Sequence, residues 1–456
     1  MKRLEKGLNK IPKGAGMLEK YFKFKERNTD IKTEIIAGIT TFITMAYIIF
    51  VQPAVLSQGG MDFGAVMVAT CLSSAIATLI MGLYANYPIA LAPGMGENFY
   101  FVYTVILGMG IIWQKVLGAV FISGVLFIIL SLWKVREKII ENVPSSLKSG
   151  IAGGIGLFIT FIGFIQSGII QKGGVVLTIG NLYQKEVILS ITGLIITGTL
   201  MSLRVKGNIL IGIIITAIIG LFMGIIKYEG IIGKIPSITP TFFKLDIIGA
   251  LKEGIFTVIF IFLFMDLFDT VGTVIGVGEA GGFISDGKFP KVERVLLSDA
   301  IGTVVGAVLG TSTVTSYIES ASGISVGGRT GFTSLVTAIL FLLSLFFYPF
   351  VKMIGTGIQT ESGITLYPVT APALIIVGSL IIPSIKKIKW EDPTESIPAF
   401  LSFVGIPFTY NIGEGIAFGF VSYFFLKLLS GRYKELNPVV IIVAVAFILR
   451  FLFLRG

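Results

Sequence analysis

Four acidic side chains stand within long apolar segments of this sequence. Asp266 and Asp269 are three residues apart, so on a helix they would share one face. Glu319 follows a segment rich in serine and threonine, and Glu97 precedes Asn98 in a segment rich in proline and glycine. An ionised carboxylate at the centre of a bilayer costs about 2.5–3.5 kcal/mol. Some of these acids must therefore be protonated, hydrogen-bonded or in contact with water.

The same four acids are candidates for proton transfer. Burial and a nearby like charge both favour the neutral form of a carboxylic acid. The chain has no histidine, the commonest proton carrier. We therefore expect proton coupling through carboxyl groups, namely those of Asp266, Asp269, Glu319 and Glu97. Asp266 has an alternative interpretation as a buried hydrogen-bond partner between helices, whereas Asp299 and Glu279 are expected to cap helices or to be solvated.

Polar and aromatic side chains near these acids suit a flat heterocyclic ligand. A carboxyl group accepts hydrogen bonds from ring N–H groups and donates one when protonated, while the Asn98 amide both donates and accepts. Four aromatic residues follow directly: Phe99, Tyr100, Phe101 and Tyr103. Aromatic faces beside such groups suit a planar ring, although the 37 phenylalanines of the chain are also what an apolar core needs.

The composition places these residues in a membrane. Of the 456 residues, 54% are hydrophobic and 14% are charged, whereas soluble domains have about 25% charged residues. Apolar stretches of about 20 residues, enough to cross the hydrocarbon core as a helix, recur along the chain. We therefore predict an all-α polytopic membrane protein.

Several classes of function are disfavoured. The formal net charge of +10 invites a nucleic-acid interpretation, but the basic residues lie in short loops beside apolar segments, as the positive-inside rule describes. Cys71 is the only cysteine and histidine is absent, so we expect no disulfide, no metal site and no cofactor. For the same reason we do not expect an enzyme.

The apolar runs predict about 14 membrane spans in two sets of seven. The first set comprises residues 35–56, 64–85, 88–108, 112–133, 147–169, 187–203 and 208–226. The second comprises residues 254–276, 295–311, 313–325, 330–350, 370–384, 397–410 and 413–430. A further apolar stretch, 438–454, either spans the membrane or lies in the interface between Arg432 and Arg455.

Lysine and arginine predict the orientation. If the N-terminus is cytoplasmic, the loops after even-numbered spans are cytoplasmic too, and these loops carry most of the basic residues: Lys134, Arg136, Lys138, Lys148, Arg204, Lys206, Lys288, Lys291, Arg294, Arg329, Lys386, Lys387, Lys389, Lys427, Arg432 and Lys434. Residues 1–34 are polar and basic and lack an early apolar core, so no signal peptide is expected. We predict a multi-pass protein of the inner (cytoplasmic) membrane with a cytoplasmic N-terminus.

Spans 3 and 10 are interrupted by short extended stretches, which indicates two inverted seven-span repeats. Because seven is odd, the second set enters the membrane in the opposite sense, a design in which the substrate binds near the midplane between broken helices. Pro88, Pro93 and Gly94 interrupt span 3, and residues 311–316 favour extended backbone in span 10. The half-helices that follow would point free N–H groups at a ligand. Ordinary proline and glycine kinks are the alternative.

Four runs of residues resemble the AzgA-like purine permeases, a branch of the nucleobase–cation symporter superfamily that includes uracil and xanthine permeases. They are Ile39-Thr-Thr-Phe-Ile-Thr-Met-Ala-Tyr47, Asn86-Tyr-Pro-Ile-Ala-Leu-Ala-Pro-Gly-Met-Gly96, Asp266-Leu-Phe-Asp-Thr-Val-Gly-Thr273 and Gly310-Thr-Ser-Thr-Val-Thr-Ser-Tyr-Ile-Glu-Ser320. The resemblance implies proton-coupled uptake of adenine, guanine or hypoxanthine by an elevator-like movement. It also implies a homodimer that forms through the gate domains.

The resemblance implies a division into two domains as well. The core domain would comprise residues 35–133 (spans 1–4) and 254–350 (spans 8–11). The gate domain would comprise residues 147–226 (spans 5–7) and 370–430 (spans 12–14). Residues 1–34 would form a basic cytoplasmic segment, and residues 431–456 a C-terminal apolar segment.

Motif matching assigns roles to individual residues. Asp269 takes the place of the acid that grips the base, Glu319 that of the acid or amide in span 10, and Asn98 that of the polar residue in span 3. Asp266 is a further acid characteristic of this branch. The substrate site that we expect also includes Phe99, Thr44 and Thr315.

Two departures from the family pattern leave the base preference open. Gln52-Pro53 stands where Asn-Pro is expected, and Glu97 stands where an apolar residue is more usual. A uracil or xanthine permease, an anion carrier of the same fold and a passive channel remain alternatives, and sodium is an alternative to the proton. An anion site would hold few acids, and a channel would not accumulate its solute.

Overall fold

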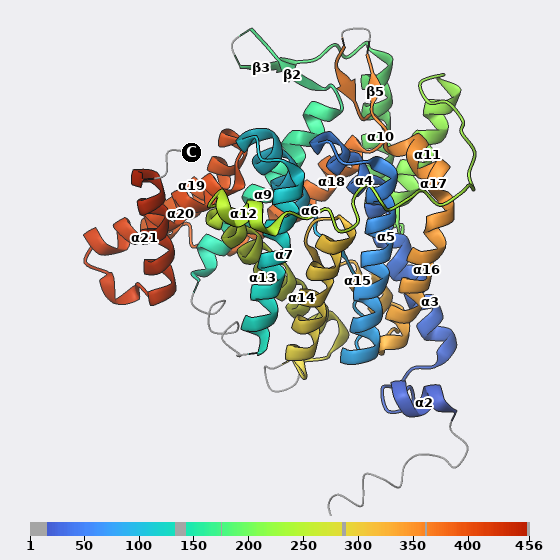
Figure 1. Ribbon diagram of the computed structural model, residues 1–456, viewed down its shortest axis with the longest axis horizontal. Coiled ribbons are helices and arrows are strands. Elements are labelled where there is room, and N and C mark those ends of the chain that lie inside the picture. Colours follow the sequence, from blue (N-terminus) through green and yellow to red (C-terminus); the bar gives the residue numbers. More distant parts are fainter. Residues whose placement is uncertain (1–15, 133–142, 175, 285–288, 361–362, 454–456) are drawn as a thin grey trace, which may run out of the picture.

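The computed structural model describes residues 16–132, 143–174, 176–284, 289–360 and 363–453 (Figure 1). Its helices are α2 (Met17–Phe22), α3 (Ile31–Met45), α4 (Ile48–Leu56), α5 (Phe63–Ile80), α6 (Met95–Phe99), α7 (Trp113–Leu132), α9 (Ser145–Gln166), α10 (Lys185–Ser202), α11 (Asn208–Phe222), α12 (Ile247–Lys252), α13 (Phe256–Gly281), α14 (Val292–Leu309), α15 (Ser320–Ser325), α16 (Gly331–Ser344), α17 (Tyr348–Gly355), α18 (Ala371–Ile381), α19 (Pro393–Thr409), α20 (Ile412–Leu429) and α21 (Pro438–Phe453). Residues 81–85 and 100–108 are π-helical. The strands are β1 (Leu91–Pro93), β2 (Ile170–Lys172), β3 (Leu177–Ile179), β4 (Val314–Ser316), β5 (Ile358–Gln359) and β6 (Thr365–Leu366). The predictions for residues 1–15, Lys134, Arg136, Lys138, Lys288 and Arg455 fall outside the described residues.

Helices dominate the described part of the chain, as the composition predicts. Eight helical segments there are long and apolar enough to cross a membrane, whereas α11 and α21 are apolar but shorter. Helix α21 corresponds to the extra apolar stretch 438–454; its 16 residues extend about 24 Å at about 1.5 Å per residue. This length is below the hydrocarbon thickness of about 30 Å. The predicted all-α membrane fold is confirmed.

Both predicted interruptions are extended segments, and they pair with each other. Strands β1 and β4 run antiparallel, with Ala92 opposite Thr315. The Gly94 N–H donates to the Thr313 carbonyl oxygen over 2.9 Å. Every residue of both strands is buried, and the prolines of the first segment prevent a continuous helix. The pairing satisfies backbone groups that water cannot reach inside a membrane.

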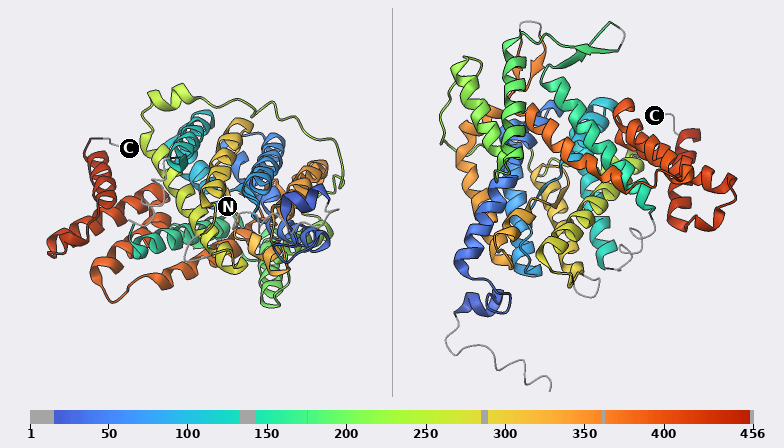
Figure 2. Two further views of the ribbon diagram at one scale, coloured as in Figure 1. Left: turned by 90° about the horizontal axis from the view of Figure 1, so that it is seen from below. Right: turned by 180° about the vertical axis from the view of Figure 1, so that it is seen from behind.

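The helices fall into two groups that pack mainly within themselves. In the first group, α14 packs against α5 and α7, and α16 packs against α3 and α5. In the second group, α9 packs against α18 and α19, α19 against α20, and α20 against α21. Figure 2 shows that α19, α20 and α21, in red, extend to one side of the bundle. The paired strands β1 and β4 contact α5 and α14, so they belong to the first group.

The two ends of the bundle differ. Helix α2 lies at one end, and the β2–β3 hairpin and β5 lie at the other (Figure 1). Arg27, which follows α2, donates to the carbonyl oxygens of Asn86 and Arg329 over 2.7 and 2.8 Å. The segment before α3 therefore holds together the two loops that precede β1 and α16.

Glu34 joins α3 to the start of α16 and is fully buried. Its carboxylate accepts hydrogen bonds from the backbone N–H groups of Arg329, Thr330 and Thr333 over 2.8–3.1 Å. It also accepts from the Thr333 hydroxyl over 2.5 Å. The first N–H groups of a helix have no partner within that helix. Glu34 supplies an acceptor for one of them, that of Thr333, and also holds the two residues that precede α16.

We expect Glu34→Ala to lower the free energy of unfolding by about 2–4 kcal/mol, because several buried donors lose their acceptor at once. Thermal unfolding in detergent measures the change, and Glu34→Gln should lose less because its amide oxygen still accepts. Glu26→Ala is the control, since Glu26 forms only an exposed ion pair with Lys23. Equal melting temperatures for Glu34→Ala and the wild type would contradict this role.

Candidate functional site

Asp269 lies on an open face of α13, near the middle of this 26-residue helix. Its side chain is exposed, as is Gly272 one turn further along. Asp266 and Thr270, on the neighbouring faces of the same helix, are buried. A carboxyl group at mid-span needs water or a polar ligand, because lipid does not solvate it. We therefore expect the open face of α13 at Asp269 to contact water or a polar ligand.

Glu319 ends the second interrupted segment, directly before α15, and is half-buried. The Tyr47 hydroxyl donates to its carboxylate over 2.7 Å, and the Thr44 hydroxyl lies 3.4 Å from its backbone carbonyl oxygen. Helices α13 and α15 are in contact, and the charges of Asp269 and Glu319 are close enough to interact. Residues at the break between α3 and α4 thus hold Glu319 beside α13.

Two further carboxylates, those of Asp266 and Asp299, are buried beside the neighbouring face of α13, in a network of hydroxyl groups. The Thr270 hydroxyl donates to Asp299 over 2.8 Å and lies 3.5 Å from Asp266. Asp266 also accepts from the Thr303 hydroxyl over 3.1 Å, and Asp299 accepts from the Ser316 hydroxyl over 2.9 Å. The network ties α13, α14 and β4 into one unit.

The position of Asp299 corrects a prediction. We expected a helix cap or a solvated side chain, but Asp299 lies within α14 and is fully buried. The helix begins earlier than the apolar run suggests, at Val292. The spacing of four residues to Thr303, which puts both side chains on one face of a helix, was the signal that could have revealed the network. Glu279 is exposed in the last turn of α13, as expected.

Glu97 and Thr315 meet at Gly94, where α6 begins. A Cβ atom placed on Gly94 would lie 2.2 Å from Oε2 of Glu97 and 2.9 Å from Cγ2 of Thr315. Only glycine leaves room for this contact. Glu97 is also close enough to Asp269 for their charges to interact. The Thr315 hydroxyl lies 2.9 Å from that of Thr270, so Thr315 joins the buried network.

Asn98 is fully buried and contacts the second interrupted segment. The Ser312 hydroxyl donates to Oδ1 of Asn98. Nε2 of Gln52 donates to the hydroxyls of Ser312 and Thr311 over 3.0 and 2.8 Å. Gln52 and Ser312 are site residues that we did not predict from the sequence. The only signal was the departure of Gln52 from the expected asparagine.

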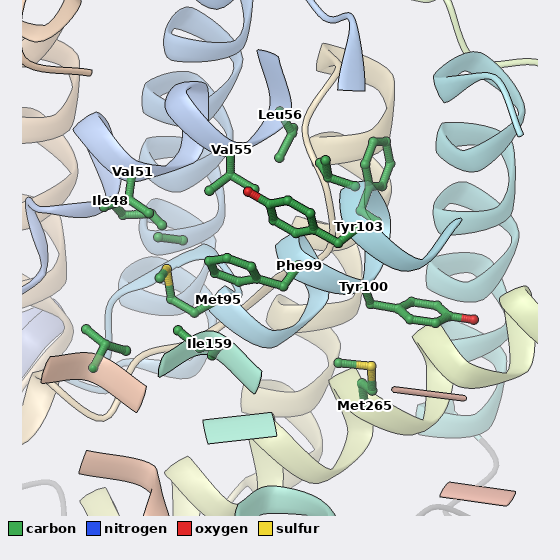
Figure 3. Packing of buried hydrophobic residues seen from close by; sticks show 14 of the residues in the cluster. Ile48, Val51, Val55, Leu56, Met95, Phe99, Tyr100, Tyr103, Ile159 and Met265 are labelled. Atoms are coloured by element: carbon green, nitrogen blue, oxygen red, sulfur yellow. The ribbon is translucent and has the colours of Figure 1, made fainter. Parts of the chain in front are cut away.

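Phe99 is a core residue in this conformation. It has no exposed surface, and its ring stacks on that of Tyr103 with centroids 5.5 Å apart and planes 13° apart. Figure 3 shows both rings among Val51, Val55 and Met95. Phe99 is therefore apart from the open face of α13 here.

The N–H groups at the start of α15 are used locally. Those of residues 320–322 donate to the carbonyl oxygens of residues 317–319, whereas the N–H of Gly94, directly before α6, donates to the carbonyl oxygen of Thr313. Helices α6 and α15 have only five and six residues. The expectation that free N–H groups point toward a ligand is therefore not supported at α15, and at α6 it stays a prediction.

The arrangement brings carboxyl groups from three elements together: Asp269 on α13, Glu319 before α15, and Glu97 on α6. Within the described ranges, no group of three or more His, Cys, Asp or Glu side chains is placed to hold a metal ion. Carboxyl groups accept hydrogen bonds when ionised and also donate them when protonated. The site therefore suits a neutral ligand with N–H donors, together with protons.

Two cavities lie away from these acids. One, of about 440 Å³, is lined by residues that include Glu395, in the first turn of α19, and Glu435, between α20 and α21. Both acids pair with the fully buried Lys427, at 3.0 and 2.6 Å. The other cavity, of about 280 Å³, is lined partly by Arg27 and Arg329. Neither cavity contains a predicted site residue.

We expect Gly272→Cys to react with a water-soluble maleimide and Thr270→Cys to remain unreactive. An added Cβ at Gly272 has no atom within 4 Å, whereas Thr270 is fully buried. The native Cys71 is buried, so the wild type supplies a low background. Mass spectrometry of the labelled protein counts the adducts. Equal labelling at both positions would show that this face of α13 is not selectively open.

Relatives of known sequence identify the kind of protein. The Permease family model (Xan_ur_permease) matches residues 32–418. A putative permease of Methanocaldococcus jannaschii is 55% identical over 442 residues, which cover 96% of this chain and 99% of that protein. The adenine permease AdeP of Escherichia coli K12 is 44% identical over 443 residues, 97% of each chain. The guanine/hypoxanthine permease PbuG of Bacillus subtilis is 44% identical over 451 residues, 96% of this chain and all of that one.

Solved structures share the fold at low sequence identity. The transmembrane domain of the cyanobacterium bicarbonate transporter BicA aligns with a TM-score of 0.61 and 13% identity, covering 84% of this chain and 97% of that chain. SLC26A9 aligns with a TM-score of 0.62 and 12% identity, and the alignment covers 94% of this chain and 69% of that chain. The family match spans both interrupted segments and the acids around them. This chain is therefore a multi-pass membrane transporter, not an enzyme, and belongs to the Permease family.

Proposed function

We propose that this protein takes up purine nucleobases (adenine, guanine or hypoxanthine) together with protons across the cytoplasmic membrane. The observation that carries the proposal is the meeting of three carboxyl groups, those of Asp269, Glu319 and Glu97, beside the paired strands. Carboxylates accept from the N–H groups of a purine, and a protonated one donates to a ring nitrogen. The relatives named adenine permease and guanine/hypoxanthine permease support the choice of purines.

In this proposal some site residues contact the base, some carry protons, and Asp269 and Glu319 do both. The base contacts Asn98, Asp269, Glu319, Phe99, Thr44 and Thr315. Protons are carried by Asp266, Asp269, Glu319 and Glu97. Some of these side chains are buried in the present conformation, so the base reaches them only when α6 moves relative to the second group of helices.

We also propose an elevator movement of the core domain (35–133 and 254–350) past the gate domain (147–226 and 370–430). The packing of the helices into two separate groups supports this division. The gate domain would form the homodimer contact, surrounded by membrane lipid. The basic residues at the end of the bundle that carries α2, among them Arg27, Arg294 and Arg329, support a cytoplasmic N-terminus.

We expect purified protein in liposomes to accumulate at least one labelled purine among adenine, guanine and hypoxanthine when the outside is acidic. Dissipating the proton gradient with a protonophore should abolish accumulation, because proton entry drives it. Xanthine and uracil in the same panel test the neighbouring branches of the family. Accumulation driven by a sodium gradient alone would show that sodium, not the proton, is the coupling ion. Equilibration of the purine across the membrane without accumulation would indicate a channel.

We expect Asp269→Asn and Glu319→Gln to reduce purine accumulation at least tenfold while the protein still reaches the membrane. Each change removes an acceptor and a site of protonation but keeps the size of the side chain. Glu279→Gln, on the exposed last turn of α13, is the matched control and should transport normally. Uptake assays with quantified membrane protein measure the effect, and normal uphill uptake by both site variants would defeat the assignment.

A further inference from the structure

Three buried polar side-chain atoms lack a partner at one place, beside the crossing of β1 and β4. They are Nδ2 of Asn98, Oε1 of Gln52 and Oγ1 of Thr313, and none of them has a hydrogen-bond partner in the described part of the chain. All three residues are fully buried. Buried polar groups in native proteins are nearly always paired, with protein, water or a ligand. The cluster therefore marks a place where a partner from outside the chain is needed.

A directed chain of hydrogen bonds joins Gln52 to Asn98 through Ser312. The amide nitrogen of Gln52 gives one hydrogen to Thr311 and the other to Ser312, over 2.8 and 3.0 Å. A hydroxyl group has a single hydrogen to donate, and Ser312 gives its hydrogen to Oδ1 of Asn98. The carbonyl oxygen of Asn98 is thereby held toward Ser312, with one of its two lone pairs used. The N–H groups that remain free are those of the Asn98 amide nitrogen.

We propose that Gln52 and Ser312 determine substrate specificity by fixing the orientation of the Asn98 amide. This inference rests on the proposed function. Asn98 follows Glu97 on α6, and α6 contacts α13, which carries Asp269. Held in this orientation, Asn98 has its carbonyl oxygen turned toward Ser312 and its N–H donors turned away from it. It therefore selects a base that presents an acceptor, such as an unprotonated ring nitrogen or a carbonyl oxygen, toward α6.

The acids and the amide would then bind complementary groups of one planar ligand, its N–H donors and its acceptor. Ionised Asp269 and Glu319 accept from its N–H groups, and Asn98 donates to its acceptor. A base with an N–H group facing Asn98 would bring two donors together and leave both unpaired. Unpaired donors in a buried site are costly. Gln52 and Ser312 need not touch the base, so they act as positioning residues.

The test measures competition by analogues of adenine and hypoxanthine in which one ring nitrogen at a time is replaced by C–H. In the wild type, the analogue that lacks the nitrogen facing Asn98 should bind about tenfold more weakly than its parent base. In Ser312→Ala, this penalty should shrink to less than about threefold, because the Asn98 amide is then free to turn over. A variant with merely disturbed packing would weaken all analogues together and leave the ratios unchanged.

Thr311→Val is the matched control, because it removes a hydroxyl bonded to the same Gln52 amide but outside the chain to Asn98. It should keep the wild-type ratios. Gln52→Leu is a second variant, which frees Ser312 to accept from Asn98 and should also reduce the penalty. Wild-type ratios in both Ser312→Ala and Gln52→Leu would overturn this inference while the proposed function stands. Failure of the wild type to bind any base would overturn the proposed function itself, and with it this inference.

Discussion

The antiparallel pairing of β1 and β4 at membrane depth is the constraint on which the rest of the structure depends. A membrane-buried segment that is not helical must find partners for its N–H and C=O groups, because lipid offers none. Here each interrupted segment supplies the partners of the other, through contacts such as that between the Gly94 N–H and the Thr313 carbonyl. The pairing also brings the start of α6 and the start of α15 together. Residues more than 200 positions apart thus share one site.

The acids divide into two kinds according to what surrounds them. Asp266 and Asp299 are buried and accept hydrogen bonds from the hydroxyls of Thr270, Thr303 and Ser316. This network holds α13, α14 and β4 in fixed relation. Asp269 and Glu319 lie where solvent or a ligand can reach them. The buried network therefore supports Asp269 and Glu319, whose carboxyl groups are available for hydrogen bonding and for protonation. Rigid support of this kind is what a binding site needs.

The same fold carries other chemistry in other proteins. A bicarbonate transporter shares the arrangement of helices at 13% sequence identity, yet a cluster of carboxyl groups would repel an anion. Function in such folds depends on the side chains at the crossing, not on the helices that position them. In this chain the hydrogen-bond chain from Gln52 through Ser312 to Asn98 links both interrupted segments to the first span. The crossing therefore combines structural support with recognition.

The sequence by itself determined that the chain is a helical membrane protein and where two of its helices are broken, and it placed Asp266, Asp269, Glu319 and Glu97 within apolar segments. Apolar length, proline and the cost of a charge in lipid are local properties, so they can be read without a structure. Only the tertiary structure decided that Asp299 is buried, that Phe99 packs into the core, and that Gln52 contacts Ser312. These facts depend on contacts between segments distant in the chain. The pairing of β1 with β4, which creates those contacts, has no signature in either segment alone.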